Sequence, residues 1–539
     1  MKKISFFLSA LVLGLGLASC EKQLDIAQKS VLDYGTYYAE AGDTEADQLI
    51  ASVYRTYYNN VMGIEHNILL DVLSDDHHVG GGGTSDNANQ FRNAGNFIMT
   101  SSESCPRVMY EGIYKCIYYC NSILEKIADD RNSAEILRVK AEAKFFRAIC
   151  MFEAVRLWGT PPFVDHLLSA EEYEMPNGDT KEIITWCLSN LQEAADALPA
   201  LSAIGTQKAF GARVSKHAAL AYKGKVALWY GTRYKDNTVL GEAVAPLKAV
   251  ISSGLYGLVD DMGTLFRPAG DYCKEYLFEH NAGENDGHPG SAQNDLRPTW
   301  MGLRVENMTL PSGFQGGGWG WDGVSGEFGR FLTQHDGLDG QRFKAWIATY
   351  DQIMALPYDA GMEPGVKATG YYDNEGYFRL KGTLYKADLY DVPGFWRYTF
   401  TNDPYMRYAE VLLMYAEACQ ATGQDTAGGL DALNQVRKRA GLEPVAALNL
   451  QDIKDERRAE LWGEQERFFD LVRWGDAATA LKDKNKTWYT FYGYKPGTTE
   501  WDIRTETGWS KGWDSKYELM PFPYAQLSAN PNLKQNPGW

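Results

Sequence analysis

The amino-acid sequence predicts a mainly α protein: a body of paired helices, similar to tetratricopeptide repeats, that carries an aromatic- and glycine-rich insert with short strands. Apolar residues recur at helical spacing through most of the 539-residue chain. Successive helix pairs begin roughly 30–45 residues apart, which is the spacing of helical-hairpin repeats. Between about 270 and 400 this periodicity fades, and glycine and aromatic residues become frequent.

Five long helices are predicted in the N-terminal part, which we assign to about residues 20–270. Their apolar-periodic stretches cover 43–58, 107–129, 133–158, 179–198 and 212–231. Most of them end at glycine or proline, and the segment 159–162, Gly-Thr-Pro-Pro, is the clearest stop because proline cannot continue a helix.

Three more helices are predicted in the C-terminal part, about residues 401–539. The first starts at Asp403-Pro404, an N-cap followed by a first-turn proline, and ends at Gly423. A second follows and ends at Gly441. The third starts with Asn449 as N-cap and continues without interruption to Gly475. Because short loops join these helices, we expect them to pack as antiparallel neighbours.

The insert, about residues 271–400, has a different character. Tyr371-Tyr372 and 377–380 are typical of short strands or hairpins. A stretch of this length without helical periodicity is either a binding insert or a disordered region. Its many Trp, Tyr and Phe residues favour a folded binding insert, since disordered segments are poor in aromatics.

The N-terminus is typical of a secretory signal. Lys2 and Lys3 precede an apolar run from Phe6 to Ala18, which is shorter than the ~20 residues that span a bilayer. We therefore predict a signal peptide over 1–19 and one mature domain over 20–539. The segment 17–20, Leu-Ala-Ser-Cys, resembles the lipobox of bacterial lipoproteins, in which the cysteine, here Cys20, becomes lipidated. The alternative is an ordinary cleavage site with an incidental cysteine.

The charge balance excludes one class of partner. The chain has 53 Lys and Arg against 70 Asp and Glu, a formal net charge of -17, which becomes -19 once Lys2 and Lys3 are removed. A surface of this sign repels phosphate backbones. We therefore expect no nucleic-acid partner.

The cysteines after Cys20 are scattered and odd in number. With no CxxC pair and no histidine at ligand spacing, they predict neither a disulfide framework nor a zinc site, and we expect small buried apolar side chains. They are Cys105, Cys116, Cys120, Cys150, Cys187, Cys273 and Cys419.

Five segments together carry a family resemblance. They are AEAKFFRAICMFEAVRLWGTPP at 141–162, RYAEVLLMYAEA at 407–418, LNQVRKRAGL at 433–442, ERRAEL with RFFDLVRWG at 456–475, and NPNLKQNPG at 530–538. In this order they resemble the SusD/RagB family of Bacteroidetes outer-membrane lipoproteins. The resemblance spans the mature chain from end to end.

The resemblance implies a SusD-like helical body and a nutrient-binding lipoprotein at the cell surface. It implies anchoring in the outer membrane through acyl chains such as palmitate on Cys20. The protein would bind oligosaccharide and pass it to a TonB-dependent, SusC-like transporter. Some members of the family serve peptide import instead. A cofactor and catalytic residues are not expected.

The enzyme alternative is a surface glycosidase, which would need two carboxylates ~5–10 Å apart. Sequence cannot measure that distance, and no carboxylate in the insert stands out. No GxSxG, HExxH or SxxK motif is present. The charged residues between Arg457 and Arg473 are predicted to be a ladder of helical ion pairs, each contributing ~0.2–0.5 kcal/mol, and not catalytic carboxylates.

Sugar recognition requires flat aromatic platforms with planar polar side chains at their edges. The insert supplies both, and the alternative is that its tryptophans form a core. The candidates from the insert are Trp300, Trp319, Trp321, Asn294, Arg304 and Asp322. The family resemblance adds His77 and Asn89, because in SusD-like proteins the segment after the first helices borders the ligand site.

Three further patterns are weaker. The loop from Asp75 to Gly83 offers four adjacent donors, but they cannot all face one ion on an extended loop, and its glycines favour a mobile surface; we predict no metal there. Residues 318–323 match GxGxxG, but without a preceding strand or following helix they do not predict a nucleotide site. The aromatic-rich region from Trp488 to Trp513 is predicted to pack as a C-terminal cap, with a second binding surface as the alternative.

Overall fold

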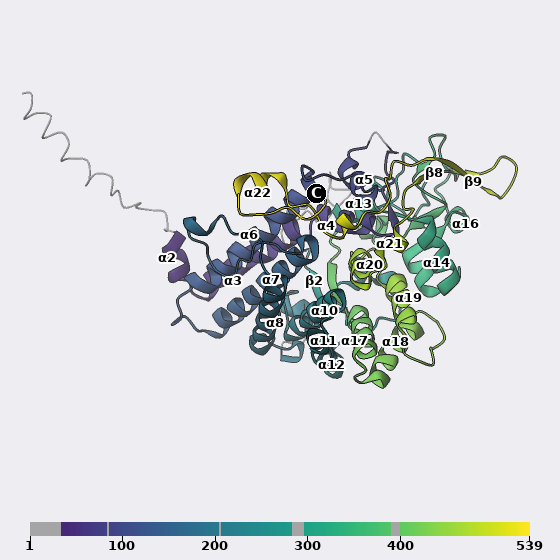
Figure 1. The fold of residues 1–539 in the computed structure, drawn as a ribbon. Coiled ribbons are helices and arrows are strands. Elements are labelled where there is room, and N and C mark those ends of the chain that lie inside the picture. The colour runs from purple at the N-terminus through teal and green to yellow at the C-terminus, as the bar shows by residue number, and fades with distance from the viewer. Residues whose placement is uncertain (1–33, 84–85, 204–205, 283–295, 390–398) are drawn as a thin grey trace, which may run out of the picture.

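A computed structural model describes residues 34–83, 86–203, 206–282, 296–389 and 399–539. The molecule is mainly helical, as predicted, and its strands are short. Figure 1 shows the first helices at one end of the body and the insert with the C-terminal strands at the other. Among the described helices, none combines the length and the apolar composition that a membrane span requires.

The five helices predicted in the N-terminal part are confirmed, with boundaries shifted by a few residues. In chain order the elements are α2 (Tyr34–Ala39), α3 (Asp43–Thr56), the π-helical turn η1 (Tyr57–Val61), α4 (Ile64–Leu73), β1 (His77–His78), α5 (Asn89–Gly95), α6 (Ser104–Lys126), α7 (Ala134–Trp158), α8 (Thr180–Ala197), α9 (Gln207–Phe210), α10 (Lys216–Tyr234), α11 (Asn237–Gly241) and α12 (Val244–Ser252). The Ser133 hydroxyl caps α7 by accepting from the Ile136 amide at 3.2 Å, and Gly159 ends it at φ 73°.

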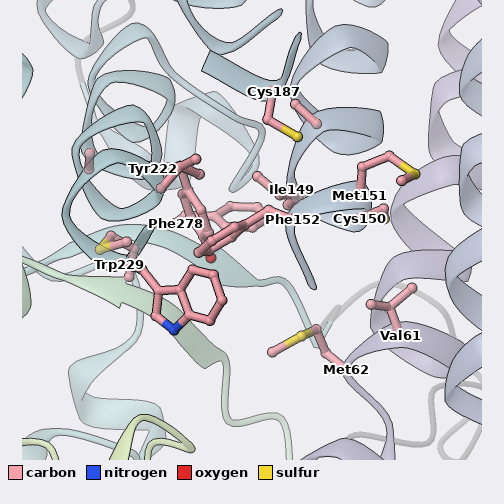
Figure 2. Close-up of a cluster of buried hydrophobic side chains, with 14 of the residues drawn as sticks. Val61, Met62, Ile149, Cys150, Met151, Phe152, Cys187, Tyr222, Trp229 and Phe278 are labelled. Atoms are coloured by element: carbon pink, nitrogen blue, oxygen red, sulfur yellow. The ribbon is translucent and has the colours of Figure 1, made fainter. Parts of the chain in front are cut away.

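The core lies between these helices. α7 packs against both α6 and α8, and α8 packs against α10. Figure 2 shows Phe278 beside Tyr222 and Phe152, with Cys150 and Cys187 among the same apolar side chains. The ring of Phe278 lies 5.5 Å from that of Phe145. All the described cysteines are free thiols; Cys273 is half-buried and the others are buried, which agrees with the prediction.

The predicted start of the first C-terminal helix is wrong. Residues Asp403–Arg407 form strand β7, which pairs antiparallel with β2 (Tyr276–His280), and helix α17 (Tyr408–Thr422) begins only afterwards. Pro404 lies opposite Glu279 in this two-stranded sheet, where a missing amide hydrogen is tolerated because each strand has a free edge. The tertiary pairing with β2 overrides the local helix-start pattern.

The third predicted C-terminal helix is interrupted. Helices α18 (Thr426–Arg439) and α19 (Leu450–Glu460) are followed by a turn and by α20 (Arg467–Trp474). Asn449 caps α19 as predicted, accepting from the Asp452 amide at 2.9 Å. The turn buries Trp462, which is 1% exposed and stacks on His77 with ring centroids 4.8 Å apart. Burial of this indole decides the break.

The insert is folded, and the C-terminal strands complete its sheets. Its elements, with those that follow α20, are α13 (Arg297–Met301), β3 (Gly323–Val324), α14 (Gly326–Asp336), α15 (Gln341–Trp346), β4 (Ile347–Thr349), α16 (Tyr350–Met354), β5 (Tyr371–Tyr372), β6 (Tyr377–Arg379), α21 (Ala477–Ala480), β8 (Thr487–Tyr494), β9 (Trp501–Thr507) and α22 (Tyr524–Ala529). The predicted strands at 371–372 and 377–380 are confirmed. Strand β8 pairs with both β5 and β9, and β4 pairs with β6.

A buried ion network joins the insert to the C-terminal helices. Arg407 Nη1 lies 2.5 Å from Glu275 and 3.1 Å from Glu460. Arg342 Nη1 lies 2.5 Å from Glu456 and 3.2 Å from Glu460, so Glu460 bridges the two arginines. Burial alone would raise the pKa of Glu460, but the guanidiniums of Arg439, Arg407 and Arg342 lower it to about 2.

The predicted ladder of helical ion pairs is present only in part: Arg473 Nη2 lies 2.8 Å from Asp470 Oδ1 at a spacing of three residues, but both side chains are buried. Arg457 binds Asp470 with Nε 2.9 Å from Oδ2, and both side chains are buried. Arg458 and Arg467 bind Asp76 and Asp75, nearly 400 residues away along the chain. The partners of Arg457, Arg458 and Arg467 thus come from other elements and cannot be recognised in the local sequence.

Removal of one member of the network should destabilise the protein strongly. We expect Arg407→Leu to lower the free energy of unfolding by about 3–5 kcal/mol, because Glu275, Glu460 and Glu464 would each lose an ion-pair partner in the protein interior. The matched control is Arg107→Leu, since Arg107 pairs with Glu111 on the exposed face of α6. That change should cost about 0.5 kcal/mol or less. Denaturant unfolding of both variants tests this, and equal effects would contradict it.

Candidate functional site

The loop between α4 and α5 forms one side of the candidate site. Strand β1 pairs with β3, and the Gly81 amide donates to the Gly320 carbonyl at 2.7 Å. Gly81 has φ 59°, and a Cβ there would lie 2.6 Å from Asp86 Oδ2 and 2.9 Å from Trp321 Cδ1. Glycine is required here both for its backbone conformation and for the close approach. The expectation of a mobile glycine loop is wrong, because the loop is packed.

Two tryptophans from the insert lie against this loop. The rings of Trp319 and Trp321 are 4.5 Å apart at an angle of 47°, and both are half-buried. The Trp319 amide donates to the Thr299 carbonyl at 2.7 Å, and the Trp321 amide donates to the Trp300 carbonyl at 3.0 Å. These backbone bonds hold the two indoles in place before any ligand arrives.

Polar side chains lie along the edge of this pair. Arg304 Nη1 lies 2.6 Å from Asp86 Oδ2 and donates to the Trp319 carbonyl at 3.3 Å. Partial burial of Asp86 would raise the pKa of its carboxyl group. Hydrogen bonds, among them the one from the Gly82 amide, outweigh this effect and hold the pKa below its usual value. Asn89 is exposed and accepts from Arg92 Nη1 at 2.9 Å. Asp86 and Arg92 are not among the residues predicted from the sequence.

A second aromatic pair continues the surface. Trp488 of β8 stacks on Trp509, with ring centroids 5.5 Å apart at 29°, and Trp509 is 49% exposed. The guanidinium of Arg92 lies 5.9 Å from the centre of Trp488. Trp513 packs against the buried ring of Phe97 at 5.3 Å, as the predicted cap requires. The cap interpretation therefore holds for Trp513 but not for Trp509.

We call Trp319, Trp321, Trp488 and Trp509 the aromatic surface. Phe91 and Arg92 of α5 connect its two pairs, since the ring of Phe91 lies 5.9 Å from that of Trp321. The alternation of tryptophan with glycine and polar residues in both segments was the signal available in the sequence. That both segments contact α5 was not visible there.

Three of the predicted ligand-binding residues lie behind this surface. Trp300 is 3% exposed, His77 1% and Asp322 0%. Such burial does not agree with direct contact to a ligand. Trp300 belongs to the main hydrophobic core, where an apolar ring is most stable. His77 and Asp322 hold the loops together. Asn294, also predicted, lies outside the described residues.

A buried polar cluster supports the loop from Asp75 to Gly83. His77 Nδ1 lies 2.6 Å from Asp322 Oδ1, and Arg379 Nη1 lies 2.6 Å from Asp322 Oδ2. Asp71 accepts from the amide and from the side chain of Gln465, both at 3.1 Å. Burial and the neighbouring Asp322 raise the pKa of Asp71 to about 6, and burial lowers that of His77 to about 4.

The same cluster is the one group in the described part of the chain whose donors converge as a metal site would require. Its three ligand atoms lie within 4.8 Å of one another. However, Arg379 already neutralises Asp322, and Gln465 donates one hydrogen bond to each carboxyl oxygen of Asp71. Asp75 and Asp76, the acidic residues of the loop, bind Arg467 and Arg458. These contacts engage the carboxylates of Asp71, Asp75 and Asp76 and one oxygen of Asp322, whereas His77 Nδ1 and Asp322 Oδ1 face each other without a well-formed hydrogen bond. We assign the cluster a supporting role.

Comparisons with known proteins agree with this architecture. The profile described as "SusD family" matches residues 279–539, and the one described as "Starch-binding associating with outer membrane" matches residues 31–228. A SusD-like protein of Formosa agariphila is 24% identical over 96% of this chain and 95% of its own. The starch-binding protein SusD of Bacteroides thetaiotaomicron is 26% identical over 75% of this chain and 74% of its own. The solved structure of a laminarin-binding SusD-like protein is 27% identical, with a TM-score of 0.69 over 92% of this chain and 99% of that one.

The raised pKa of Asp71 predicts a pH-dependent stability. Since the folded state holds this proton more tightly than the unfolded state, the stabilisation is full below about pH 4 and is lost as the pH rises through about 6. The substitution Asp71→Asn removes this titration. As the pH rises from 4.5 to 7.5, we expect the free energy of unfolding of this variant to increase by about 2 kcal/mol relative to that of the wild type.

The measurement is denaturant unfolding of both proteins at the two pH values. The control is Asp260→Asn, a change at an exposed aspartate. If the difference in the free energy of unfolding between wild type and Asp71→Asn does not vary with pH, the carboxyl group of Asp71 does not carry a proton in this pH range.

Proposed function

Because this chain belongs to the SusD family, we propose that it is a non-catalytic lipoprotein that binds oligosaccharide at the cell surface. The aromatic surface is the observation that carries the proposal. Sugar rings have apolar faces that stack on indoles, and tryptophans held in place before binding lose little conformational freedom. Two pairs of indoles on one surface suit a ligand of several sugar units better than a single sugar.

The polar edge suits the hydroxyl groups of such a ligand. Asp86 and Arg304 offer an acceptor and donors beside Trp319, and Asn89 offers an amide beside Arg92. Their mutual hydrogen bonds orient these groups in advance. The names of two of the relatives refer to starch and to laminarin. By likeness to them, a glucan oligosaccharide is the first ligand class to test on this chain.

The proposed location and partner rest on the sequence and on likeness to the family. We propose removal of residues 1–19, acylation of Cys20, and anchoring of the domain 20–539 in the outer membrane with its binding face outward. A SusC-like, TonB-dependent transporter would receive the oligosaccharide. The match to a profile described as associating with the outer membrane supports this placement. Transport rather than cleavage is then the fate of the ligand.

Truncation of Trp319 or of Trp509 should weaken binding and leave the fold intact. We expect Trp319→Ala and Trp509→Ala each to cost ~2 kcal/mol of binding, about thirtyfold in the dissociation constant. Trp300→Ala is the matched control from the same segment: it should lower the free energy of unfolding by ~3–5 kcal/mol through the cavity it leaves.

Affinity and melting temperature are measured on the same samples, with laminarihexaose, maltohexaose and a glycan array as ligands. If Trp319→Ala melts at as low a temperature as Trp300→Ala and its affinity is unchanged, Trp319 does not stack on the sugar. New reducing ends after incubation of the wild-type protein with these oligosaccharides would show an enzyme instead.

Replacement of Cys20 tests the anchor. We expect Cys20→Ala to remain folded and to disappear from the outer-membrane fraction, since stable anchoring needs more than one acyl chain and this residue would carry them. A Cys20→Ala protein that still sediments with outer membranes at high salt would place the anchor elsewhere.

Mild detergent extraction of the wild-type protein should recover it together with a large barrel transporter.

A further inference from the structure

A second cavity lies far from the aromatic surface, on the side of α3. In Figure 1, α3 and the strand β8 that carries Trp488 are at opposite ends of the molecule. The cavity measures about 440 Å³ and lies between α3, the π-helical turn η1, the loop at Gly211 and the end of β2. Its lining combines aliphatic and aromatic side chains with polar ones, among them Asp47, Arg55, Asn59, Arg213 and Asn281. Such a cavity is the kind of place where proteins bind small ligands.

The local sequence of α3 builds one wall. Residues Asp47, Ile50, Ala51, Tyr54 and Arg55 all line the cavity, and their spacing of three and four places them on one face of the helix. The helix then widens into the π turn Tyr57–Val61, a feature that is frequent at functional sites. The widened turn brings the side chain of Tyr58 to the cavity as well.

Aromatic rings form the floor. Tyr58 stacks on His280, with ring centroids 4.1 Å apart at 19°, and the Tyr54 ring lies 5.8 Å from that of Tyr58. Both tyrosines and His280 are less than 10% exposed, so the floor is rigid. Ile50 and the small side chain of Ala51 leave the space above it open. A flat apolar group fits between these walls.

The two arginines that line the cavity differ in the number of carboxylates they contact. Arg213 is neutralised by Asp47 at 3.1 Å, Glu135 at 2.7 Å and Glu142 at 2.9 Å. Arg55 is exposed and, within the described part of the chain, has no carboxylate in ion-pair distance. It lies two helical turns from Asp47, about 12 Å along the axis, so that acidic group does not compete with an anion at Arg55.

We propose that this cavity is a second ligand site, for a carboxylate with a bulky apolar group, such as the C-terminal residue of a peptide or a free aromatic acid. The apolar group enters between Ile50 and the Tyr54–Tyr58 floor, and the carboxylate pairs with Arg55. Within the described residues Arg55 has no carboxylate partner, so its guanidinium can offer two parallel hydrogen bonds to a ligand carboxylate. The site is independent of glycan binding at the aromatic surface.

The test uses the mature protein and two small probes. N-acetyl-L-tryptophan carries the charge, and N-acetyl-L-tryptophanamide has the same ring without it. We expect the acid to bind with a dissociation constant of about 0.1–1 mM, which is usual for a ligand of this size, and the amide to bind at least about fivefold more weakly. Arg55→Gln should remove that difference. A tetrapeptide ending in tryptophan separates the two sources of the carboxylate: tighter binding than the acid indicates a peptide terminus, and equal or weaker binding a free acid.

Two matched tryptophan variants test whether the ligand binds in this cavity. Ala51→Trp fills the cavity from the exposed face of α3 and should abolish binding, whereas Ser52→Trp, on the neighbouring exposed position, should not. Melting temperatures confirm that both variants fold. The proposal is overturned if the acid shows no saturable binding up to about 10 mM, if Ala51→Trp binds like Ser52→Trp, if acid and amide bind equally, or if Trp319→Ala removes the binding.

Discussion

Burial of charge in the C-terminal half is the constraint on which the rest of the structure depends. Glu460 lies between Arg342 and Arg407, and each of these arginines holds further carboxylates. Such groups are costly to bury unless every partner is in place. The insert therefore docks against α19 in only one way. A network of this kind contributes little net stability, but it excludes alternative packings in which one charge would be left alone.

The constraint extends from the network to the candidate site. Trp462, in the turn after α19, stacks on His77, and His77 lies against Asp322, the residue next to Trp321. The conformation of the glycine loop and of the two insert tryptophans is thus set from the protein interior. The strand β8, which carries Trp488, pairs with β5 of the insert, and the guanidinium of Arg92 in α5 lies 5.9 Å from the Trp488 ring. The aromatic surface is thus supported by three distant parts of the chain.

The two proposed sites use aromatic residues in different ways. The aromatic surface has indoles that are half-buried or exposed, with polar groups at their edge, which suits a long, hydroxyl-rich ligand. The cavity beside α3 has rings whose faces are already stacked, as Tyr58 is on His280, and its open space lies above them. It therefore suits a compact apolar group. This difference in ring exposure is what allows the two ligand classes to be assigned separately.

Hydrophobic periodicity and cap residues in the sequence by themselves determined the mainly α class, the long helices and the folded insert, because these are local properties: Ser133, Gly159 and Asn449 act on their own helices. Only the tertiary structure decided that 403–407 is a strand, that the third C-terminal helix breaks at Trp462, and that the charged residues of α19 and α20 are buried. It also decided which tryptophans are accessible, Trp319 and Trp509 but not Trp300. The physical reason is common to all of these: pairing, burial and charge neutralisation depend on partners tens to hundreds of residues away, and local spacing carries no information about them.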